Sequence, residues 1–598
     1  MREVYPKREF IVRMEAPQYN AAMPRPNKPR AVSRTTPAPS FETSKPDPLP
    51  LLLAAGLEPG QAEGILRPYG FRSVAEADAN LQAMAGDPHT RRQLAEILAP
   101  MLEAVSRTAD PDQALNHWER LLNEVNRSGF LDYVRQLPRM LDVLCTIFGN
   151  SDALSFALIR DPALVYWLGE VSVLEKPSTR TGMEQELEKS LRSVQSPELK
   201  LEALRRFRRR EMLRIGVRDL LRLSDVPATT AALSDAAAVL IDAAYRTVDT
   251  NLKVRYGTPM HKNRSGKWVE TRFVVIGMGK LGAGELNYSS DVDLIYVYES
   301  LNGETRTARR STQAGLLTTS GISNEEYFEM LSRDLTKALT EQTKEGSVFR
   351  VDLRLRAEGT VGRLARSLED YDRYYKTRGQ VWERLALLKS SPIAGSVEVG
   401  RAFMRIVHPF VFGDRRAKPD TASALKVIED VRSVKDMIDA KMAGRGHERR
   451  NVKLGVGGIR EIEFLVQTIQ TLAGRAVPAL MDRSTLGGLK RFAAAKLISP
   501  QERDALIAAY IFLRDVEHKL QMVLDLQTHA LPDELDELER CAIRMGYGES
   551  GRSTARRRFA ADHDAHTAVV HEFFKSLFYE PGSSSLLKAT LRAIKGGR

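Results

Sequence analysis

The spacing of apolar residues predicts that both ends of the chain are helical. From about residue 51 to 255, and again after about residue 420, apolar residues recur at intervals of three and four, as one buried face of a helix requires. Clear examples are residues 121–149, 234–257 and 502–527. We expect each region to form several packed helices.

The pattern changes in the middle of the chain. Residues 273–276 and 293–298 are short apolar runs typical of buried strands, and residues 347–356 alternate strictly, which predicts a third strand. A polar loop is expected over 300–322. A capping box then opens a helix with one apolar face at residue 324. The middle of the chain therefore predicts a compact α/β unit.

These patterns predict an α+β fold that is mostly α, with a small mixed-sheet core flanked by helical domains. Ten of the 28 prolines fall in the first 50 residues, which hold few large apolar side chains and cannot offset the entropy of ordering. We therefore divide the chain into a disordered proline-rich tail, a helical N-terminal domain, the α/β core and a C-terminal helical bundle, at residues 1–50, 51–255, 256–415 and 416–598.

Composition is that of an ordinary soluble protein. Hydrophobic residues make up 43% and charged residues 28% of the 598 positions, enough for several cores. The two cysteines, Cys145 and Cys541, lie in different predicted domains, which excludes a disulfide scaffold and a cysteine-based zinc cluster. Without a long apolar run or a signal sequence, we expect no membrane span and a cytoplasmic location.

A glycine-rich turn follows the first predicted strand. Residues 277–282 fit the G-x-G-x-x-G pattern of dinucleotide-binding proteins. The next strand, however, begins only about ten residues after Gly282, and a crossover that short cannot join parallel strands. We therefore do not expect a Rossmann unit.

Three aspartates mark the candidate catalytic centre. Asp291 and Asp293 lie two positions apart at the start of the second strand, so their carboxylates point to one face. Asp352 lies on the predicted third strand and shares its face with Arg350, Arg354 and Arg356. Taken alone, each aspartate is more readily explained as a cap or an ion-pair partner than as a catalytic residue. Together they predict a divalent cation, because clustered carboxylates repel one another without one.

The order of strand, glycine turn, short helix, Asp-x-Asp strand and later Asp strand resembles the DNA-polymerase-β-type nucleotidyltransferases. Longer motifs resemble one family among them, the bacterial glutamine synthetase adenylyltransferases, which attach AMP to a glutamine synthetase tyrosine and remove it. These motifs are GMGKLGAGELNYSSDVDLIYVY, FRVDLRLRAEG, EDYDRYYKTRGQVWERLALLK and KLGVGGIREIEFLVQ. The resemblance runs from about residue 120 to 580 and implies that the α/β unit is a nucleotidyltransferase core.

The resemblance implies a role for each matching residue. The three aspartates would bind Mg²⁺ or Mn²⁺ and act in catalysis. The nucleotide and its phosphates would be held by Gly279, Lys280, Ser290, Arg354 and Arg356. Arg460 and Glu461 are accessory candidates, with Glu461 preferred because Glu463 can pair within the bundle. The implied small molecules are ATP or ADP, AMP and phosphate. The implied partners are glutamine synthetase and a nitrogen-signalling regulatory protein.

The direction of the reaction is less determined. Family members normally carry an N-terminal unit that removes AMP and a C-terminal unit that attaches it, and this sequence shows one. The segment LRRFRRREMLRIGVRDL, LNYSSD and GGIREIEF resemble the removing unit. Ala357 stands where the family usually has proline, and Ala283 where it often has glycine. These departures weaken the assignment to the removing unit more than they weaken the predicted chemistry. We favour removal, because the predicted lining is cationic.

Charge leaves two alternatives open. The net charge of +12 suits an anionic partner, so an RNA-directed nucleotidyltransferase is one alternative, although no RNA-binding module is recognisable and a nucleic-acid partner is not expected. A regulatory protein with a vestigial site is the other, against which the intact aspartates argue. We expect the arginine run at 205–210 to form a solvated helix face and His518 to be a solvated or core-edge histidine.

Overall fold

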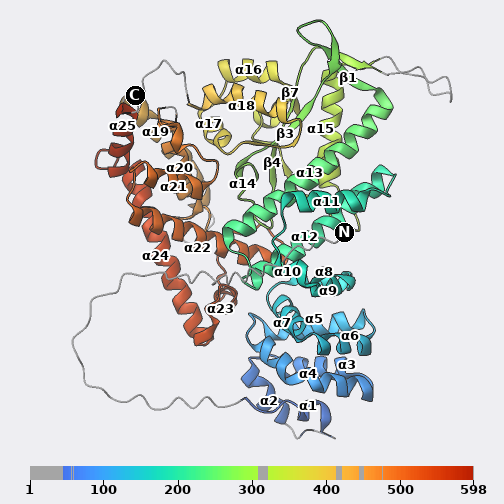
Figure 1. Ribbon diagram of the computed structural model, residues 1–598. Coiled ribbons are helices and arrows are strands. Elements are labelled where there is room, and N and C mark those ends of the chain that lie inside the picture. The colour runs from blue at the N-terminus through green and yellow to red at the C-terminus, as the bar shows by residue number, and fades with distance from the viewer. Residues whose placement is uncertain are drawn as a thin grey trace, which may run out of the picture. The chain divides into compact units, whose positions relative to one another are not determined.

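The computed structural model describes residues 45–54, 57, 60–306, 321–412, 421–443, 450–474 and 476–596. Helices dominate, and the strands form two small sheets (Figure 1). This confirms the predicted α+β fold with mostly α content. Most of the proline-rich tail predicted for residues 1–50, and most of the loop predicted for 300–322, lie outside the described residues.

Short and medium helices precede the sheets. They are α1 (Pro50–Leu53), α2 (Gln61–Leu66), α3 (Val74–Ala85), α4 (Pro88–Ser106), α5 (Pro111–Asn123), α6 (Arg127–Gln136), α7 (Pro138–Phe148), α8 (Asp152–Arg160), α9 (Ala163–Gly169), α10 (Val171–Glu175), α11 (Arg180–Leu191), α12 (Pro197–Leu220) and α13 (Val226–Tyr256). Asp, Ser, Thr or Asn side chains cap the amino ends of many of these helices, and several have proline in the first turn, as helix starts favour. Helices α1 to α10 share an apolar core around Trp118.

The sheet region and the helices after it complete the chain. The strands are β1 (Thr258–Lys262), β2 (Trp268–Glu270), β3 (Phe273–Gly277), β4 (Val292–Tyr298), β5 (Glu304–Arg306), β6 (Val351–Asp352), β7 (Ala365–Ser367) and β8 (Ser391–Gly395). The helices among them are α14 (Gly279–Ala283), α15 (Asn324–Thr340), α16 (Leu368–Thr377) and α17 (Val381–Leu388), and those after them are α18 (Val397–Phe412), α19 (Thr421–Ala443), α20 (Ile459–Ala473), α21 (Thr485–Ala494), α22 (Pro500–Leu524), α23 (Leu535–Arg544), α24 (Arg552–Phe578) and α25 (Ser585–Gly596).

The central sheet is mixed. Its strands follow the order β6-β4-β3-β8, with β7 also paired to β4. Strand β3 is antiparallel to both β4 and β8, whereas β6 and β7 run parallel to β4. Strands β2, β1 and β5 form a separate antiparallel sheet. The short antiparallel connection from β3 to β4 confirms that the glycine turn does not open a Rossmann unit.

The third strand is much shorter than the sequence predicts. The expected strand over 347–356 is reduced to Val351–Asp352, so the strand prediction is wrong outside these two residues. Before it, the N–H groups of Val348 and Phe349 donate to the carbonyl of Leu339 at the end of α15. After it, the N–H of Arg354 donates to the side chain of Asp352 at 2.8 Å. An aspartate that bonds backbone two residues ahead starts a turn, and this ends the strand.

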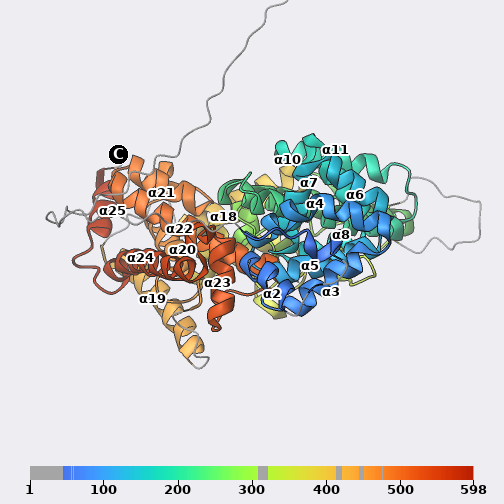
Figure 2. The same cartoon turned by 90° about the horizontal axis from the view of Figure 1, so that it is seen from below.

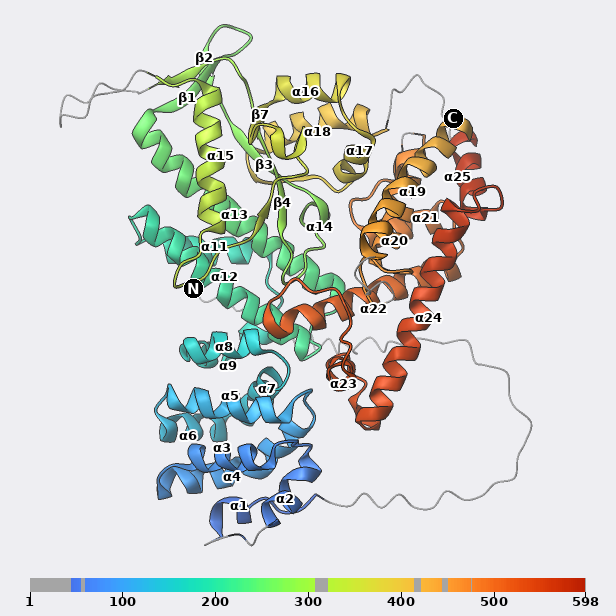
Figure 3. The same cartoon turned by 180° about the vertical axis from the view of Figure 1, so that it is seen from behind.

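Helices cover both faces of the central sheet (Figures 1 and 3). Phe273, Val275 and Tyr296 pack with α13 and α15 on one face. Val274 and Ile295 face the other way, into a cluster that includes α18 and the C-terminal helices. Figure 2 shows α20, α22 and α24 together in that C-terminal part. The site faces this side, because Asp293 shares the parity of Ile295 on β4.

Helix α13 is the one helix of the described residues that is long and apolar enough, by length and composition, to cross a bilayer. Buried residues make up 67% of its most apolar window, where it packs against α12, α15 and β8. A core helix passes the same test as a membrane span, so burial accounts for its composition. The apolar cluster around α13 includes residues on both sides of the boundary predicted at 255.

Candidate active site

The structure brings the three predicted aspartates together. Strands β4 and β6 are parallel, and their register places Asp293 directly beside Asp352. Burial, and then the negative charge of Asp352, raise the pKa of Asp293 to about 6, with Asp291 adding a smaller share. Burial and nearby negative charges both make a carboxylate harder to ionise. The three side chains therefore form one electrostatic unit.

Two arginines hold the outer carboxylates. The Nε of Arg350 donates to Asp291 Oδ1 at 2.8 Å, and the Nε of Arg354 lies 3.0 and 2.9 Å from the two carboxylate oxygens of Asp352. Burial alone would raise the pKa of Asp352, but the hydrogen bonds from Arg354 outweigh it and hold the pKa below its usual value. Asp293 has no such partner among the described residues.

The donor set fits a hard divalent cation, because carboxylate oxygens are the ligands that Mg²⁺ and Mn²⁺ prefer. The raised pKa of Asp293 points the same way, since a cation would relieve the repulsion. In the described part of the chain, however, no three acidic, histidine or cysteine side chains are arranged to hold a metal ion. Arg350 and Arg354 occupy oxygens that a cation would need, so loading requires them to move.

The glycine turn backs directly onto Asp293. The backbone N–H of Met278 donates to the carbonyl of Asp293 at 2.8 Å. Gly279 has a φ of +54°, and a Cβ there would come within 2.7 Å of Asp293 Oδ2. Both the backbone angle and the close approach require glycine at this position. The turn therefore lies against Asp293, and the predicted role of Gly279 in holding a phosphate stays a prediction.

Lys280 has a different environment from the one expected of a phosphate ligand. Its Nζ donates to both carboxylate oxygens of Glu517 on α22, at 2.9 and 3.0 Å. Burial lowers the pKa of Lys280 to about 7, although Glu517 opposes the shift. Lys280 therefore ties α14 to the C-terminal helices. Glu517 is not among the residues predicted from the sequence, because nothing in the spacing of α22 distinguishes this glutamate from a solvated one.

Arg356 is held by backbone carbonyls, although its positive charge still helps to lower the pKa of Asp352. Its guanidinium donates to the carbonyls of Leu353, Thr360, Gly362 and Arg363 and is buried there. The prediction that it shares a face with Asp352 and Arg354 is wrong, because the strand ends at Asp352. Ser290 immediately precedes Asp291 and lines a pocket beside the aspartates.

The two accessory candidates on α20 differ. Arg460 is close enough to Asp293 to lower its pKa, so it adds a positive charge to the site. Glu461 is buried against α19 and α24, where it lies 3.3 Å from both Lys435 and His571. Its predicted direction toward the aspartates is wrong. Glu463 pairs with Lys389 at 2.7 Å, in line with the expectation that it is paired in the interior.

Two further predictions need correction. His518 is fully buried and its Nε2 lies 3.2 Å from Asn287 Oδ1, so it is a core histidine whose pKa burial holds well below the usual range. The arginine run at 205–210 is not a solvated face. Arg205 is buried, and Arg209 makes two 2.9 Å hydrogen bonds to Glu345. Acidic residues from distant segments meet this helix, which the local sequence does not reveal.

One functional candidate was missed. Lys453 lies in the glycine-rich loop before α20, and its positive charge lowers the pKa of both Asp293 and Glu517. It has no ion-pair partner within 4 Å among the residues that the structure describes. Its place in KLGVGGIREIEF, a motif already singled out, was the available signal.

Comparison with known proteins gives two family matches. The model of the glutamate-ammonia ligase adenylyltransferase family matches residues 141–406, and the model of the GlnD PII-uridylyltransferase family matches residues 432–578. The first match contains the whole central sheet and all three aspartates.

Curated relatives carry the same family name. Proteins named bifunctional glutamine synthetase adenylyltransferase/adenylyl-removing enzyme, from Nitrosococcus oceani and Thioalkalivibrio sulfidiphilus, are 37% and 34% identical over 74% and 81% of this chain. A protein of the same name from Xanthomonas campestris is 38% identical over 66% of it. The matches cover 43%, 46% and 39% of those proteins, so the chain spans less than half the length of the relatives it matches.

The mixed sheet, the glycine turn and the neighbouring aspartates have the arrangement that the sequence predicts for a nucleotidyltransferase core. The comparisons confirm the resemblance found in the sequence: residues 141–406 match the model of the glutamate-ammonia ligase adenylyltransferase family, and the curated relatives carry the corresponding name.

Proposed function

We propose that this chain is a metal-dependent nucleotidyltransferase that removes AMP from a tyrosine of glutamine synthetase. The observation that carries the proposal is the placement of Asp293 beside Asp352, directly behind the Gly279 turn. That arrangement suits phosphoryl chemistry, where positioning and charge stabilisation supply most of the catalysis. The names of the relatives supply the substrate.

The charges around the aspartates favour removal over attachment. Removal uses phosphate as the attacking group, an anion that needs a cationic lining, whereas attachment uses a neutral hydroxyl that needs a base. Positive charges among the described residues act on the carboxylates, namely those of Arg350, Arg354, Arg356, Lys453 and Arg460. Asp291 and Asp352 each pair with an arginine, and Asp293 feels the charges of Lys453 and Arg460. These positive charges would lower the cost of bringing in an anion.

The proposed reaction breaks the bond between the AMP phosphorus and the tyrosine oxygen. A phosphate oxygen forms the new bond to that phosphorus, which gives ADP, and the tyrosine oxygen leaves with the bonding pair and takes up a proton from solvent. A divalent cation held by Asp291, Asp293 and Asp352 would neutralise charge on the transferred group. Arg350 and Arg354, once released from their aspartates, are placed to bind phosphate oxygens.

The wider setting belongs to the same proposal. Glutamine synthetase is the proposed protein substrate, and the match of residues 432–578 supports a link to a PII-type nitrogen-signalling protein. ATP, ADP, AMP and phosphate are the proposed small molecules, with Mg²⁺ or Mn²⁺ as the metal. We also propose a cytoplasmic location for the enzyme.

Two incubations of the full chain test the proposal. In the first, AMP-modified glutamine synthetase is supplied with phosphate and Mg²⁺. In the second, unmodified glutamine synthetase is supplied with ATP and Mg²⁺. We expect ADP release in the first, and its loss in Asp293→Asn. Labelling from ATP without phosphate-driven ADP release would reverse the assigned direction, and inactivity in both would overturn the substrate assignment.

A further inference from the structure

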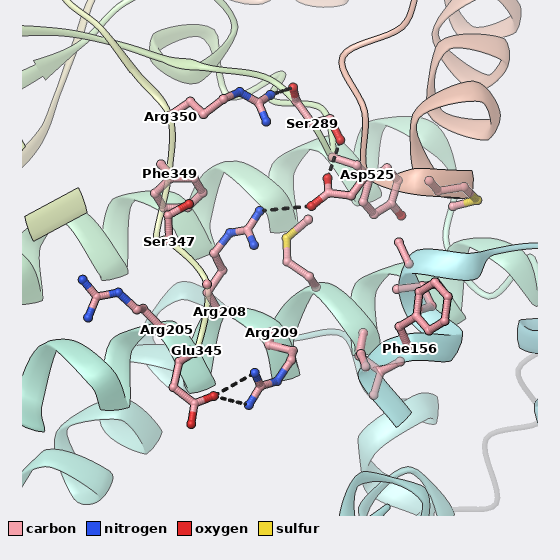
Figure 4. Close-up of a pocket in the computed structure, with 18 of the residues that line it drawn as sticks. Phe156, Arg205, Arg208, Arg209, Ser289, Glu345, Ser347, Phe349, Arg350 and Asp525 are labelled. Atoms are coloured by element: carbon pink, nitrogen blue, oxygen red, sulfur yellow. Dashed lines mark hydrogen bonds and ion pairs between the residues drawn. The ribbon is translucent and has the colours of Figure 1, made fainter. Parts of the chain in front are cut away.

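A pocket of about 420 Å³ opens beside the aspartates on the side of α12 (Figure 4). Its walls come from α8, α12, α22, the segment before β4 and residues 342–350. Ser290 and Arg350 connect it to the site, because Ser290 precedes Asp291 and Arg350 bonds to it. The proposed chemistry leaves this space unexplained.

Positive charge exceeds negative charge in the pocket. Five arginines line it, namely Arg160, Arg205, Arg208, Arg209 and Arg350, against the two carboxylates of Glu345 and Asp525. Glu345 is taken up by Arg209 and Arg160, at 2.9 and 3.3 Å. Arg205 is balanced from outside the pocket by Glu202 and Glu341. Arg208 and Arg350 remain. Arg350 bonds Asp291 and the Ser289 carbonyl through Nε and Nη2, and among the described residues its Nη1 makes no hydrogen bond.

Arg208 points into the middle of the pocket in Figure 4. Its only carboxylate within 4 Å in the described part of the chain is Asp525, at 3.8 Å, and Asp525 also accepts a hydrogen bond from Ser289. The Nε of Arg208 is buried with no hydrogen-bond partner. Burial, and in smaller part the positive charge of Arg350, lower the pKa of Arg208. A partly buried guanidinium whose buried Nε has no acceptor is costly unless an anion supplies one.

The other walls define the size and character of the occupant. Phe349 lies under the Arg208 guanidinium, 5.5 Å from it, and Phe156 is largely exposed on the opposite wall. Met212 and Met522 add apolar surface. A guanidinium above an aromatic ring is a common way to present a planar cation to phosphate. The volume exceeds that of a phosphate ion and leaves room for a larger group attached to it.

We propose that this pocket binds a phosphate group between the guanidinium groups of Arg208 and Arg350. The group comes either from free phosphate or from a nucleotide whose remaining atoms contact Phe156 and the methionines. Both sources present the same tetrahedral oxyanion, for which paired guanidinium groups are the favoured protein ligands. This inference rests on the lining of the pocket and not on the proposed reaction.

Calorimetric titration of the full chain in EDTA tests the inference, because binding through a metal at the aspartates is then absent. Inorganic phosphate and ADP are titrated separately. We expect at least one to bind, and Arg208→Gln to weaken that binding at least about tenfold, or about 1.4 kcal/mol. The matched control is Arg206→Gln, which removes the same charge from the same helix at a half-exposed position outside the pocket; among the described residues Arg206 has only a 3.7 Å pair with Glu345, which Arg209 holds at 2.9 Å.

The outcomes separate the two sources. Binding of phosphate alone assigns the pocket to the free ion, and binding of ADP with the same dependence on Arg208 assigns it to a nucleotide. If Arg208→Gln does not melt cooperatively, the loss of ligand binding is measured in Arg350→Gln instead. That side chain is half exposed, so its replacement should leave the fold intact. Equal weakening by Arg206→Gln and Arg208→Gln, or no binding of either ligand, would overturn the inference. Adenylyl removal from glutamine synthetase is measured separately, so its presence or absence does not change the assignment of the pocket.

Discussion

Replacing Asp293 by asparagine should stabilise the metal-free protein while removing its activity. Asp293 is crowded by Asp352 and Asp291 and partly desolvated, so its pKa is raised to about 6 from the ordinary 3.8. Above that pH the folded protein must hold a carboxylate in surroundings that disfavour it. Asparagine has nearly the same shape without the charge, so the variant avoids this cost.

The size and pH dependence follow from linkage. A shift of about two units, at about 1.4 kcal/mol per unit, gives at most about 3 kcal/mol of strain in the ionised wild type. Because the folded-state pKa is raised, the favourable contribution of Asp293 is complete below the unfolded pKa of 3.8 and is lost as pH rises through about 6. Asp293→Asn should therefore match the wild type below pH 4 and exceed it in free energy of unfolding by up to about 3 kcal/mol at pH 8.

Urea unfolding in EDTA, at pH 4 and at pH 8, measures this difference. The control is Asp334→Asn, an exposed aspartate on α15 whose loss should change the urea midpoint little at either pH. Added Mg²⁺ should then stabilise the wild type and leave Asp293→Asn unaffected. A variant that is less stable than the wild type at pH 8, or a gain of equal size at both pH values, would refute the electrostatic reasoning.

The same contacts make three further predictions. Asp352→Asn should lower turnover by about a hundredfold or more with little loss of stability, measured as ADP release and as a urea midpoint. Lys389→Met should destabilise the fold by about 3–5 kcal/mol in urea, because it leaves Glu285 and Glu463 buried without their shared cation, whereas the exposed Lys376→Met should not. A chain that starts at Lys45 should keep cooperative melting and activity, whereas one that starts after Leu53 should melt earlier, because Leu51 and Leu52 are buried.

The parts of the fold that depend on local sequence patterns could be predicted. Apolar periodicity identified the helices, and the runs at 273–276 and 293–298 identified β3 and β4, because buried strands need continuous apolar residues. The prediction of the third strand was wrong because of a local hydrogen bond between a side chain and the backbone. Alternation of apolar and charged residues over 347–356 suits a strand, but the Asp352 side chain bonds the Arg354 N–H and turns the chain. Apolar periodicity alone does not reveal that a side-chain hydrogen bond competes with strand pairing here.

The candidate site also has contacts that the sequence could predict and contacts that it could not. The pairing of Asp293 with Asp352 was predictable, because both lie on strands and period-2 geometry fixes their faces. The partners of Lys280, Glu461 and His518 were not, because each is set by a residue far away in the chain. Long-range ion pairs form when helices pack, and a single sequence does not specify which faces meet.

Arg350 links the aspartates to the phosphate pocket, and this link makes a last prediction. It lines the pocket while its Nε bonds Asp291 at 2.8 Å. A cation bound at the aspartates would compete for that carboxylate and would release the guanidinium toward the pocket. Coupling of two sites through one shared group is reciprocal, so Mg²⁺ should tighten phosphate or ADP binding and either ligand should tighten Mg²⁺ binding by the same factor. Repeating the calorimetric titration with saturating Mg²⁺ measures that factor in the wild type and in Arg350→Gln. If Arg350 is the link, the tightening disappears in Arg350→Gln and persists in Arg206→Gln; equal tightening in both variants would show that the cation attracts the anion directly and that Arg350 transmits nothing.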